Sequence, residues 1–265
     1  MASEAPNTPN MLPLLYEGLE PLNRNAHGNY KVRKVAGIAR VATSHAIPVT
    51  VDEFSLAQRH YPIVFSAGDN PVPLALMGLH EGTNTFFNAD GTLIDQTAYV
   101  PAYLRRYPFV LARLRDDSDE LSLCFDPTAE AVGEFEDGEP LFDGDEPSDA
   151  TKAILQFCDQ FEQAGQRTQA FMELLKEQAL LMDGEVAIQP EGAEQPAIYR
   201  GFQMIDEEKF QALRGDELRK LNQNGGLPLI MAHLFSLSVI REIFARQVQQ
   251  GTGPTLARQP ATAEA

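Results

Sequence analysis

Short apolar runs bounded by turn-forming residues mark the first half of the chain. Tyr61–Phe65 and Val72–Leu79 are two such runs, and Gly, Pro or Asn residues lie close to both. Runs of this length between turn residues are typical of buried strands. In Leu121–Phe125, apolar and polar residues alternate, which predicts a strand with one buried face. The segment from Tyr30 to Phe125 is therefore predicted to be rich in strands.

Two hairpins are predicted within this segment. Phe109–Leu114 and Leu121–Phe125 lie on either side of a short polar stretch, as two antiparallel strands do. Thr85–Phe87 and Thr92–Ile94 flank Asp90-Gly91, a dipeptide that favours tight hairpin turns. Strands joined in this way indicate an antiparallel sheet.

Short helices are predicted between the strands. Asp52 is suited to cap a helix over Glu53–Arg59, because its side chain can accept a hydrogen bond from a first-turn N–H. Pro101 is suited to the first position of a helix over Ala102–Tyr107, where a missing N–H costs nothing.

After Ser148 the apolar residues change to helical spacing. Four of them stand at i, i+3, i+4 and i+7, which predicts a helix capped by Ser148 or Asp149; they are Ile154, Phe157, Cys158 and Phe161. Gly165 weakens this pattern, and a second helix is predicted to follow and to end near Asp183-Gly184.

The remainder of the chain predicts one ribbon and further helices. Val186–Ile188 and Ile198–Ile205 are predicted to be the two strands of the ribbon, and Asp206 to cap the helix that follows it. The last helix is predicted from Pro228 to about Gln247. Because strands come first and helices later, without regular alternation, the fold class is predicted to be α+β, with a mainly antiparallel, β-rich N-terminal half.

The chain length and its ends set the domain organisation. With 265 residues the chain is long enough for one large domain or two small ones. Residues 1–10 and 248–265 have few apolar side chains to bury, so both are predicted to be disordered tails. Residues 11–247 are predicted to form a single domain.

The charge of the chain excludes some classes of partner. It has 38 acidic and 21 basic residues, a formal net charge of −17, so it has no general electrostatic attraction to nucleic acid or to anionic membranes. Fourteen of the acids fall between Asp116 and Thr151, a segment that also contains several Gly and Pro residues. This acidic segment is predicted to be solvated loop, or else a docking strip for a basic protein.

Targeting signals are not evident in the sequence. The apolar stretch Leu227–Phe235 is interrupted by His233 and is shorter than the roughly 20 residues that span a bilayer. The first ten residues lack the basic and apolar regions of a secretory signal. Two cysteines do not make a disulfide framework. The protein is therefore predicted to be soluble and cytoplasmic, without membrane insertion.

Familiar catalytic and metal-binding motifs are missing from the sequence. There is no Gly-x-Ser-x-Gly, no Gly-Lys pair of a phosphate-binding loop and no Cys-x-x-Cys. His80-Glu81 begins like a zinc-protease motif, but residue 84 is Asn rather than His. An EF-hand loop that starts at Asp143 would require Gly where Ser148 stands. We therefore expect no metal and no cofactor.

The histidines and cysteines are predicted to be structural. His233 has helical spacing with Leu237 and Ile240, which places it on an apolar helix face as a hydrogen-bonded core residue. Cys124 and Cys158 are predicted to be buried thiols. A catalytic function would require a residue such as His27 or His80 to meet an acid in one pocket.

The densest group of recognition residues is the segment Tyr99–Phe109. It has three tyrosines, a phenylalanine and two adjacent arginines. Such residues either pack the sheet and pair with nearby acids, or form a pocket in which Arg105 or Arg106 holds a carboxylate or phosphate. The candidate ligand-binding residues are Tyr99, Tyr103, Arg105, Arg106 and Tyr107, followed by His27 and Asn84.

An ordered series of motifs from about residue 12 to 247 resembles the bacterial SapC-like family. The matching stretches are Pro21–His27, Glu53-Phe54, Tyr61–Phe65, Pro73–Leu79, Asn84–Gly91, Tyr99–Phe109, Asp137–Phe142 and Gly201–Asp206. One departure is the absence of tryptophan, which we expect in this family near Leu93.

The resemblance implies a function without established catalysis. The family is linked to surface layers by its name, and its genes lie near those of outer-membrane receptors and flavin-dependent halogenase-like proteins. It is distinct from the peptide-transporter permease of the same name. We expect a non-catalytic accessory or binding protein of a surface-layer or nutrient-uptake system, with a protein or peptide partner. The alternative is an enzyme that acts on a peptide or small metabolite.

Overall fold

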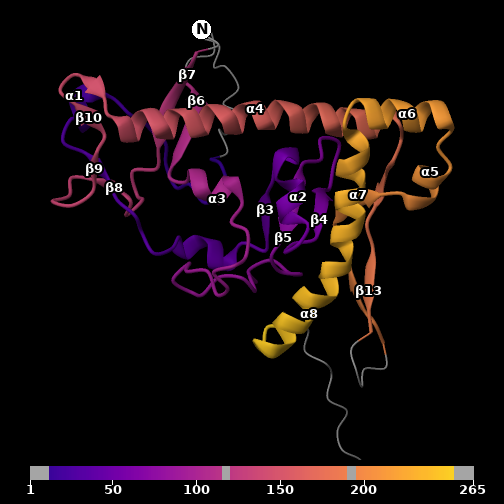
Figure 1. Cartoon of the computed structure of the whole chain (residues 1–265). Helices are drawn as coiled ribbons and strands as arrows, with labels where there is room; N and C mark the ends of the chain where they lie inside the picture. Colours follow the sequence, from indigo (N-terminus) through magenta and orange to yellow (C-terminus); the bar gives the residue numbers. More distant parts are fainter. Residues whose placement is uncertain (1–11, 115–119, 190–194, 254–265) are drawn as a thin grey trace, which may run out of the picture. The chain divides into compact units, whose positions relative to one another are not determined.

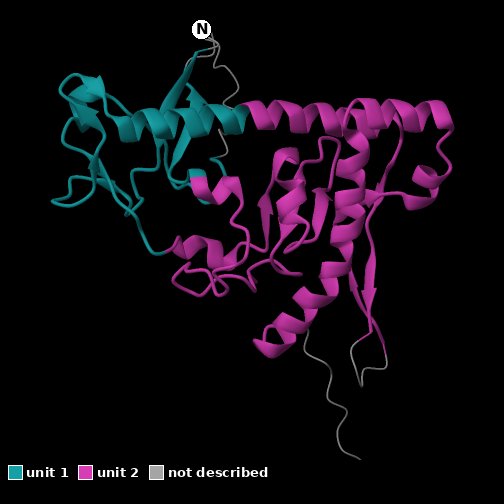
Figure 2. Ribbon diagram, viewed as in Figure 1, with its two compact units in different colours: residues 1–36, 106–162 teal, residues 37–105, 163–265 magenta. Residues whose placement is uncertain are grey.

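The computed structural model describes residues 12–114, 120–189 and 195–253 and divides into two compact units. Unit 1 comprises residues 1–36 and 106–162, and unit 2 comprises residues 37–105 and 163–265 (Figure 2). The single domain over 11–247 stays a prediction. The predicted tail at 1–10 lies outside the described residues, as does the predicted tail at 248–265 from residue 254 onward.

Unit 1 is built on short antiparallel strands. Strand β7 (Leu121–Phe125) pairs with β6 (Phe109–Arg113) and with β1 (Glu20–Pro21), which confirms the predicted hairpin. The turn of this hairpin, residues 115–119, lies outside the described residues. The core of the unit gathers Phe109, Leu123 and Phe125 from the two strands, Leu141 from the segment before α4 and Cys158 from helix α4.

Smaller elements complete unit 1. A second sheet has the order β8-β2-β9, and β10 pairs with β11. These strands span Lys31–Val32 (β2), Val132–Gly133 (β8), Glu139–Pro140 (β9), Phe142–Asp143 (β10) and Glu146–Pro147 (β11), and helix α1 is Arg24–His27.

Unit 2 contains a five-stranded antiparallel sheet of order β12-β15-β4-β5-β3. Its strands are β3 (Ala46–Pro48), β4 (Ile63–Ser66), β5 (Pro73–Leu76), β12 (Leu181–Asp183) and β15 (Phe202–Ile205). Helix α7 lies beside β4 (Figure 1). Strands β13 (Val186–Ile188) and β14 (Ala197–Tyr199) form a separate ribbon.

Short helices precede, separate or follow the strands of unit 2. They are η1 (Ala39–Thr43), η2 (Val51–Glu53), α2 (Phe54–Ala57), α5 (Glu207–Gln211) and α6 (Gly215–Gln223). Helix α3 (Ala102–Arg106) ends at the boundary between the units. Asp206 accepts a hydrogen bond from the backbone N–H of Lys209 and so caps α5, as predicted.

Helix α4 (Asp149–Glu177) is one helix of 29 residues, so the predicted interruption near Gly165 is wrong. Ser148 caps it, since its hydroxyl accepts a hydrogen bond from the N–H of Thr151 at 3.2 Å. An interior glycine costs a helix about 1 kcal/mol. Burial of an apolar row outweighs that cost in unit 2, where the row comprises Ala164, Phe171 and Leu175.

The last helical segment runs through α7 (Gly226–Ser236), η3 (Leu237–Val239) and α8 (Ile240–Gln249). Its 24 residues include an 18-residue window of mean hydropathy 1.5, of which 44% is buried. By length and composition alone this is the single described helix that could cross a membrane. Core helices of soluble proteins meet the same criterion, so the absence of membrane insertion stays a prediction.

Three other local predictions differ from the structure. Thr50, not Asp52, caps the helical turn at Val51–Glu53, because Thr50 and Glu53 form a reciprocal capping box. Thr85–Ile94 turns back on itself as predicted, but its antiparallel pairing is shorter than two full strands and consists of one bridge between Phe87 and Leu93. The strand predicted at Ile198–Ile205 is divided by Gly201, whose φ of +94° turns the chain from the ribbon into the sheet. The α+β fold with mainly antiparallel sheets is confirmed.

Candidate functional site

The predicted ligand-binding residues are divided between the two units. Tyr99, Tyr103, Arg105 and Asn84 belong to unit 2, whereas Arg106, Tyr107 and His27 belong to unit 1. The structure brings some of them together within each unit.

In unit 2, the buried carboxylate of Glu53 organises the predicted segment. Its Oε2 accepts hydrogen bonds from the N–H and the hydroxyl of Thr50, both at 2.9 Å. Its Oε1 accepts from the Tyr99 hydroxyl at 2.9 Å and from the N–H of Ala102 at 2.6 Å. Four donors compensate for burial of this charge, because charge-assisted hydrogen bonds replace the lost water.

Arg105 lies over the ring of Tyr99. Its Nη2 donates to the Tyr99 hydroxyl at 3.2 Å, its Nε donates to the Val100 carbonyl at 3.1 Å, and its guanidinium carbon lies 5.7 Å from the ring centroid. Arg105 is exposed and Tyr99 is half-buried. Burial, followed by the charge of Glu53, raises the pKa of Tyr99 to about 12, so the phenol is neutral and donates.

The other two predicted residues of unit 2 are buried. Tyr103 is in the core, and Asn84 is 9% exposed. The Asn84 amide donates to the carbonyls of Val41 and Ser44, both at 2.9 Å, and its oxygen accepts from the N–H of Phe86. These bonds hold neighbouring loops in place. A contact between Asn84 and a ligand stays a prediction.

In unit 1, the Arg106 guanidinium is buried over an aromatic ring. Its carbon lies 4.3 Å from the Phe161 centroid, and its Nη1 lies 3.7 Å from Oε1 of Glu162. Burial raises the pKa of Glu162, and the nearby guanidinium opposes that shift. Tyr107 donates its hydroxyl proton to Asp126 at 3.3 Å.

His27 is packed in unit 1, with a carboxylate on one ring nitrogen. Its Nδ1 accepts from the N–H of Asn23 at 3.1 Å, and its Nε2 lies 3.0 Å from Oε1 of Glu20. The ring also makes a T-shaped contact with Phe125. The side chain is only 3% exposed. This is a histidine–carboxylate pair, but one whose ring is enclosed by its own neighbours.

His233 and the cysteines have the structural roles that the sequence predicted. His233 is fully buried; its Nδ1 donates to the Ile63 carbonyl at 2.7 Å, and its Nε2 accepts from the N–H of Ile205 at 3.1 Å. Burial lowers the pKa of His233 to about 4. Cys124 and Cys158 are buried free thiols, and burial raises the pKa of Cys158 to about 11.

Metal-ligating side chains do not converge in the described parts of the chain. Across residues 12–114, 120–189 and 195–253, no group of three or more His, Cys, Asp or Glu side chains is arranged to hold a metal ion. His80 uses its Nδ1 in a 3.1 Å hydrogen bond with the Gln247 amide.

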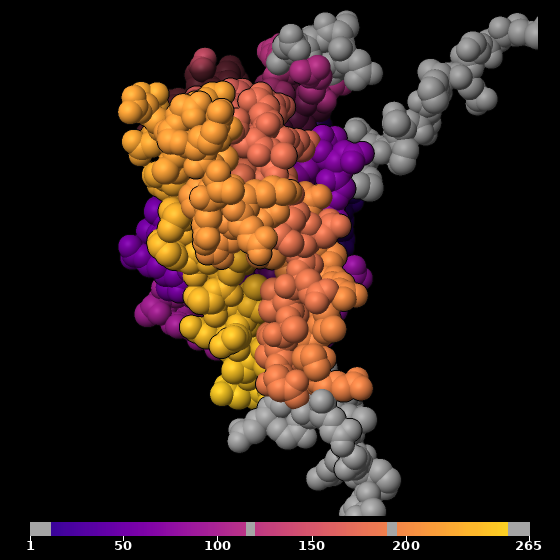
Figure 3. Space-filling model, turned by 90° about the vertical axis from the view of Figure 1, so that its right-hand side faces the viewer, coloured from indigo at the N-terminus to yellow at the C-terminus, as the bar shows by residue number. Residues whose placement is uncertain are grey.

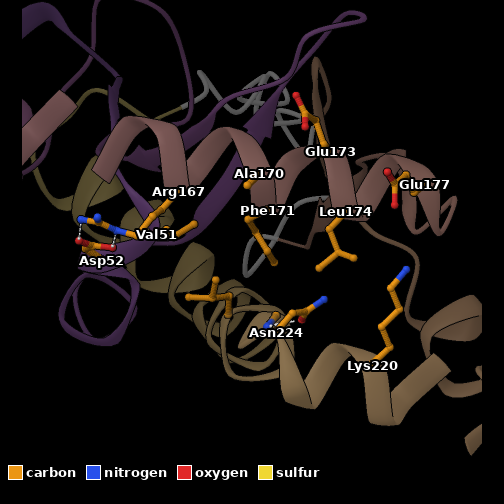
Figure 4. Close-up of a pocket in the computed structure, with 12 residues that line it drawn as sticks. Val51, Asp52, Arg167, Ala170, Phe171, Glu173, Leu174, Glu177, Lys220 and Asn224 are labelled. Carbon is orange, nitrogen blue, oxygen red and sulfur yellow. Dashed lines mark hydrogen bonds and ion pairs between the residues drawn. The ribbon is translucent and has the colours of Figure 1, made fainter. Parts of the chain in front are cut away.

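Unit 2 also contains a groove of about 550 Å³ between η2, α4 and the α6–α7 region (Figure 4). Its floor is apolar, and it consists of Val51, Ala170, Phe171, Leu174, Gly226 and Leu229. Gly226 allows the start of α7 to approach Leu174 of α4 closely, because a Cβ at residue 226 would lie 2.9 Å from Cδ2 of Leu174. Gly225 precedes it with a φ of +77° and turns the chain from α6 into α7.

Charged side chains line the rim of this groove. Arg167 makes a bidentate pair with Asp52, with its Nε 3.1 Å from Oδ1 and its Nη2 2.6 Å from Oδ2. Farther along, Glu173 and Glu177 project from α4 and Lys220 projects from α6 (Figure 4). Neither Glu177 nor Lys220 makes an ion pair with another described residue. This groove could not be predicted from local sequence patterns, because its walls come from residues up to 178 positions apart in the chain.

A family model described as SapC matches residues 22–243 of this chain. No curated protein and no solved structure matches the chain. The match extends over both units.

Proposed function

Because the chain belongs to the SapC family, we propose that it is a non-catalytic accessory or binding protein of a bacterial surface-layer or nutrient-uptake system. It acts in the cytoplasm, and its partner is a protein or a peptide. The main structural support for a binding role is the groove of unit 2. The proposed link to surface layers and nutrient uptake rests on the name of the family and on the genes that lie near its members.

The size and lining of the groove suit a peptide segment. Its volume of about 550 Å³ lies in the range of roughly 300–1,000 Å³ that is usual for binding sites. The apolar floor can take side chains such as Leu or Phe, whose burial drives association. A groove that is open at the surface admits a segment of a longer chain.

The rim charges define the flanks of such a segment. Glu173 and Glu177 on one side favour a basic residue of the partner, and Lys220 on the other favours an acidic one. Arg167 and Asp52 already neutralise each other. The preferred segment therefore carries apolar residues flanked by one charge of each sign.

The residues predicted from the sequence are proposed as a ligand surface of their own. Arg105 over Tyr99 offers a cation beside a phenol, which suits a carboxylate or phosphate of the ligand. The other members of the set pack against their own neighbours. Four of them are buried, namely Tyr103, Arg106, His27 and Asn84, and Tyr107 is half-buried.

The experiment compares partner binding by groove variants made in the protein's own cells. Ala170→Arg places a bulky cation in the groove from an exposed position of α4. Gln166→Arg adds the same side chain to the same helix at an exposed position that does not line the groove. After gentle isolation, native mass spectrometry identifies what remains bound.

We expect one discrete partner on the wild type and on Gln166→Arg, and its loss from Ala170→Arg. Arg105→Ala reports separately on the Tyr99–Arg105 surface. A partner that all three variants retain equally would exclude both surfaces.

The enzyme alternative has one contact in its favour, the pair of His27 and Glu20. The enclosed ring gives a substrate little access to that pair. Conversion of a peptide or metabolite by the wild type that Glu20→Gln abolishes would support the enzyme instead of the binding protein.

A further inference from the structure

The five-stranded sheet of unit 2 ends at strand β12, whose outer side pairs with no other described strand. Its inner side pairs with β15, and two hydrogen bonds at its ends fix the register. The N–H of Gly184 donates to the Phe202 carbonyl at 2.8 Å, and the N–H of Asp206 donates to the Leu180 carbonyl at 2.8 Å.

Backbone groups of β12 point to both sides of the strand. In an antiparallel pair, every second residue directs its N–H and C=O toward the partner strand. In this register Met182 faces β15, so the N–H and C=O groups of Leu181 and Asp183 point away from β15. These four groups make no hydrogen bond to another described residue. The edge therefore offers two donors and two acceptors to an added strand.

The side chains of β12 leave this edge accessible. Met182 is 42% exposed, Asp183 is exposed and Leu181 is half-buried. Figure 3 shows this side of unit 2, where the coral segment that contains β12 reaches the surface. Met182 is paired with Met204 and lies on the same face of the sheet, so the two thioether side chains give an added strand apolar neighbours.

A hollow of about 460 Å³ adjoins the end of β12. It lies where the chain turns from the sheet into the ribbon of β13 and β14. Gly184 and Gly201 line it without side chains, and its apolar lining comes from Ala67 and Phe202. The hollow provides room for one long side chain of a strand that pairs with β12.

The uncompensated charge at this hollow is negative. Glu185 is paired with Arg200, with its Oε2 2.5 Å from Nη2, whereas Asp183 makes no ion pair with another described residue. A Lys or Arg of an added strand brings its charge beside Asp183 and its aliphatic stem along Phe202. The whole chain has a net charge of −17, so it repels a second copy but attracts a basic peptide.

We propose that β12 is a docking edge for an extended, basic segment of a partner protein, which adds to the sheet as an antiparallel strand. One residue of the segment exchanges both backbone hydrogen bonds with Asp183 and carries the basic side chain. The residue two positions later exchanges both with Leu181, and the residue between them lies beside Met182. The edge shares no residue with the groove, so the proposal does not depend on the proposed function.

The test uses two fluorescently labelled peptides and measures their anisotropy with the full chain. The first is Thr-Lys-Val-Val-Thr, in which Lys is expected opposite Asp183 and the second Val opposite Leu181. The other peptide has the same side chains but carries N-methyl groups on Lys and on the second Val, so it lacks both donors to the edge. We expect saturable binding of the first peptide and none of the methylated one.

Two substitutions separate charge from backbone pairing on the protein side. Asp183→Asn removes only the charge, and Asp183→Pro also removes the outward N–H. Proline is compatible with this position because the N–H of Asp183 does not bond to β15 and Met182 before it is extended. We expect binding of the first peptide to weaken about threefold in Asp183→Asn and roughly tenfold in Asp183→Pro. Glu81→Gln, at an exposed residue away from β12, is the charge control and is expected to bind as the wild type does.

The peptide results overturn the proposal if the wild type binds neither peptide or binds both equally, because backbone pairing is then not used. Equal binding to the wild type and to Asp183→Pro would place the peptide elsewhere. A dimer of the wild type in sedimentation that Asp183→Pro abolishes would assign the edge to a second copy instead. Circular dichroism checks each variant, and Asp183→Asn with the methylated peptide keeps the edge testable if Asp183→Pro does not fold.

Discussion

The carboxylate of Glu53 accepts a hydrogen bond from the Tyr99 hydroxyl at 2.9 Å, although the two residues are 46 positions apart. The same carboxylate accepts the N–H of Ala102 in the first turn of α3. One buried acid therefore fixes the start of α2 and the start of α3 together.

Replacing Glu53 with alanine is expected to lower the free energy of unfolding by about 3 kcal/mol, since buried donors lose a charged acceptor. Urea unfolding measures the loss. Glu81→Gln, at an exposed residue, is the matched control and is expected to change the value by less than about 0.5 kcal/mol. A loss for Glu53→Ala as small as that of the control would contradict the central place of this carboxylate.

His233 is expected to make stability depend on pH. Burial lowers its folded-state pKa to about 4, from about 6.5 in the unfolded chain, so the unfolded state binds the proton more readily. Its contribution is fully present above about pH 6.5 and is lost as the pH falls through about 4. The shift corresponds to about 3 kcal/mol.

Urea unfolding from neutral pH down to about pH 4 tests the role of His233. In His233→Gln the side chain does not titrate, so its stability is expected to fall less steeply over this range than that of the wild type. Parallel curves for the two proteins would assign the acid sensitivity to other groups.

Both thiols are expected to be unreactive in the folded protein. Cys124 and Cys158 are buried, and burial raises the pKa of each, so little thiolate is present at about pH 8. A disulfide reagent that releases a coloured thiol is expected to report none in the native state and two in urea. Ser55→Cys, at an exposed position, provides a thiol that reacts at once. Fast reaction of the wild type would show that unit 1 opens readily.

Two glycines with the same backbone conformation are expected to differ in their tolerance of alanine. Gly91 has a φ of +78° and Gly225 a φ of +77°, so each substitution strains the backbone by about 1 kcal/mol. At Gly91 a Cβ would also lie 2.2 Å from the carbonyl carbon of Ile38, whereas nothing lies within 4 Å at Gly225. We expect Gly91→Ala to be at least twice as destabilising in thermal unfolding. Equal losses would mean that the loop near Ile38 yields without cost.

Local sequence patterns were sufficient for several elements. The alternation in Leu121–Phe125 and the polar stretch before it specify the hairpin of β6 and β7. Asp206 specifies the start of α5, because a side chain that accepts a first-turn N–H acts within four residues. The spacing around His233 placed it on a buried helix face. The series of motifs identified the family.

Local patterns failed where distant contacts dominate. Gly165 has a low helix propensity, yet α4 continues past it because apolar residues of α4 are buried in unit 2. The Thr50–Glu53 capping box is a local signal, whereas the hydrogen bonds from Tyr99 and Ala102 to Glu53 join residues at least 46 positions apart.

The family, the α+β class and the elements whose signals lie within a few residues of one another can be read from local patterns. The division of the segment Tyr99–Phe109 between two units and the existence of the groove are visible only in the folded chain. The physical reason is range: turn chemistry, capping and periodicity act along the chain, whereas a cavity arises from the packing of side chains that the sequence separates widely.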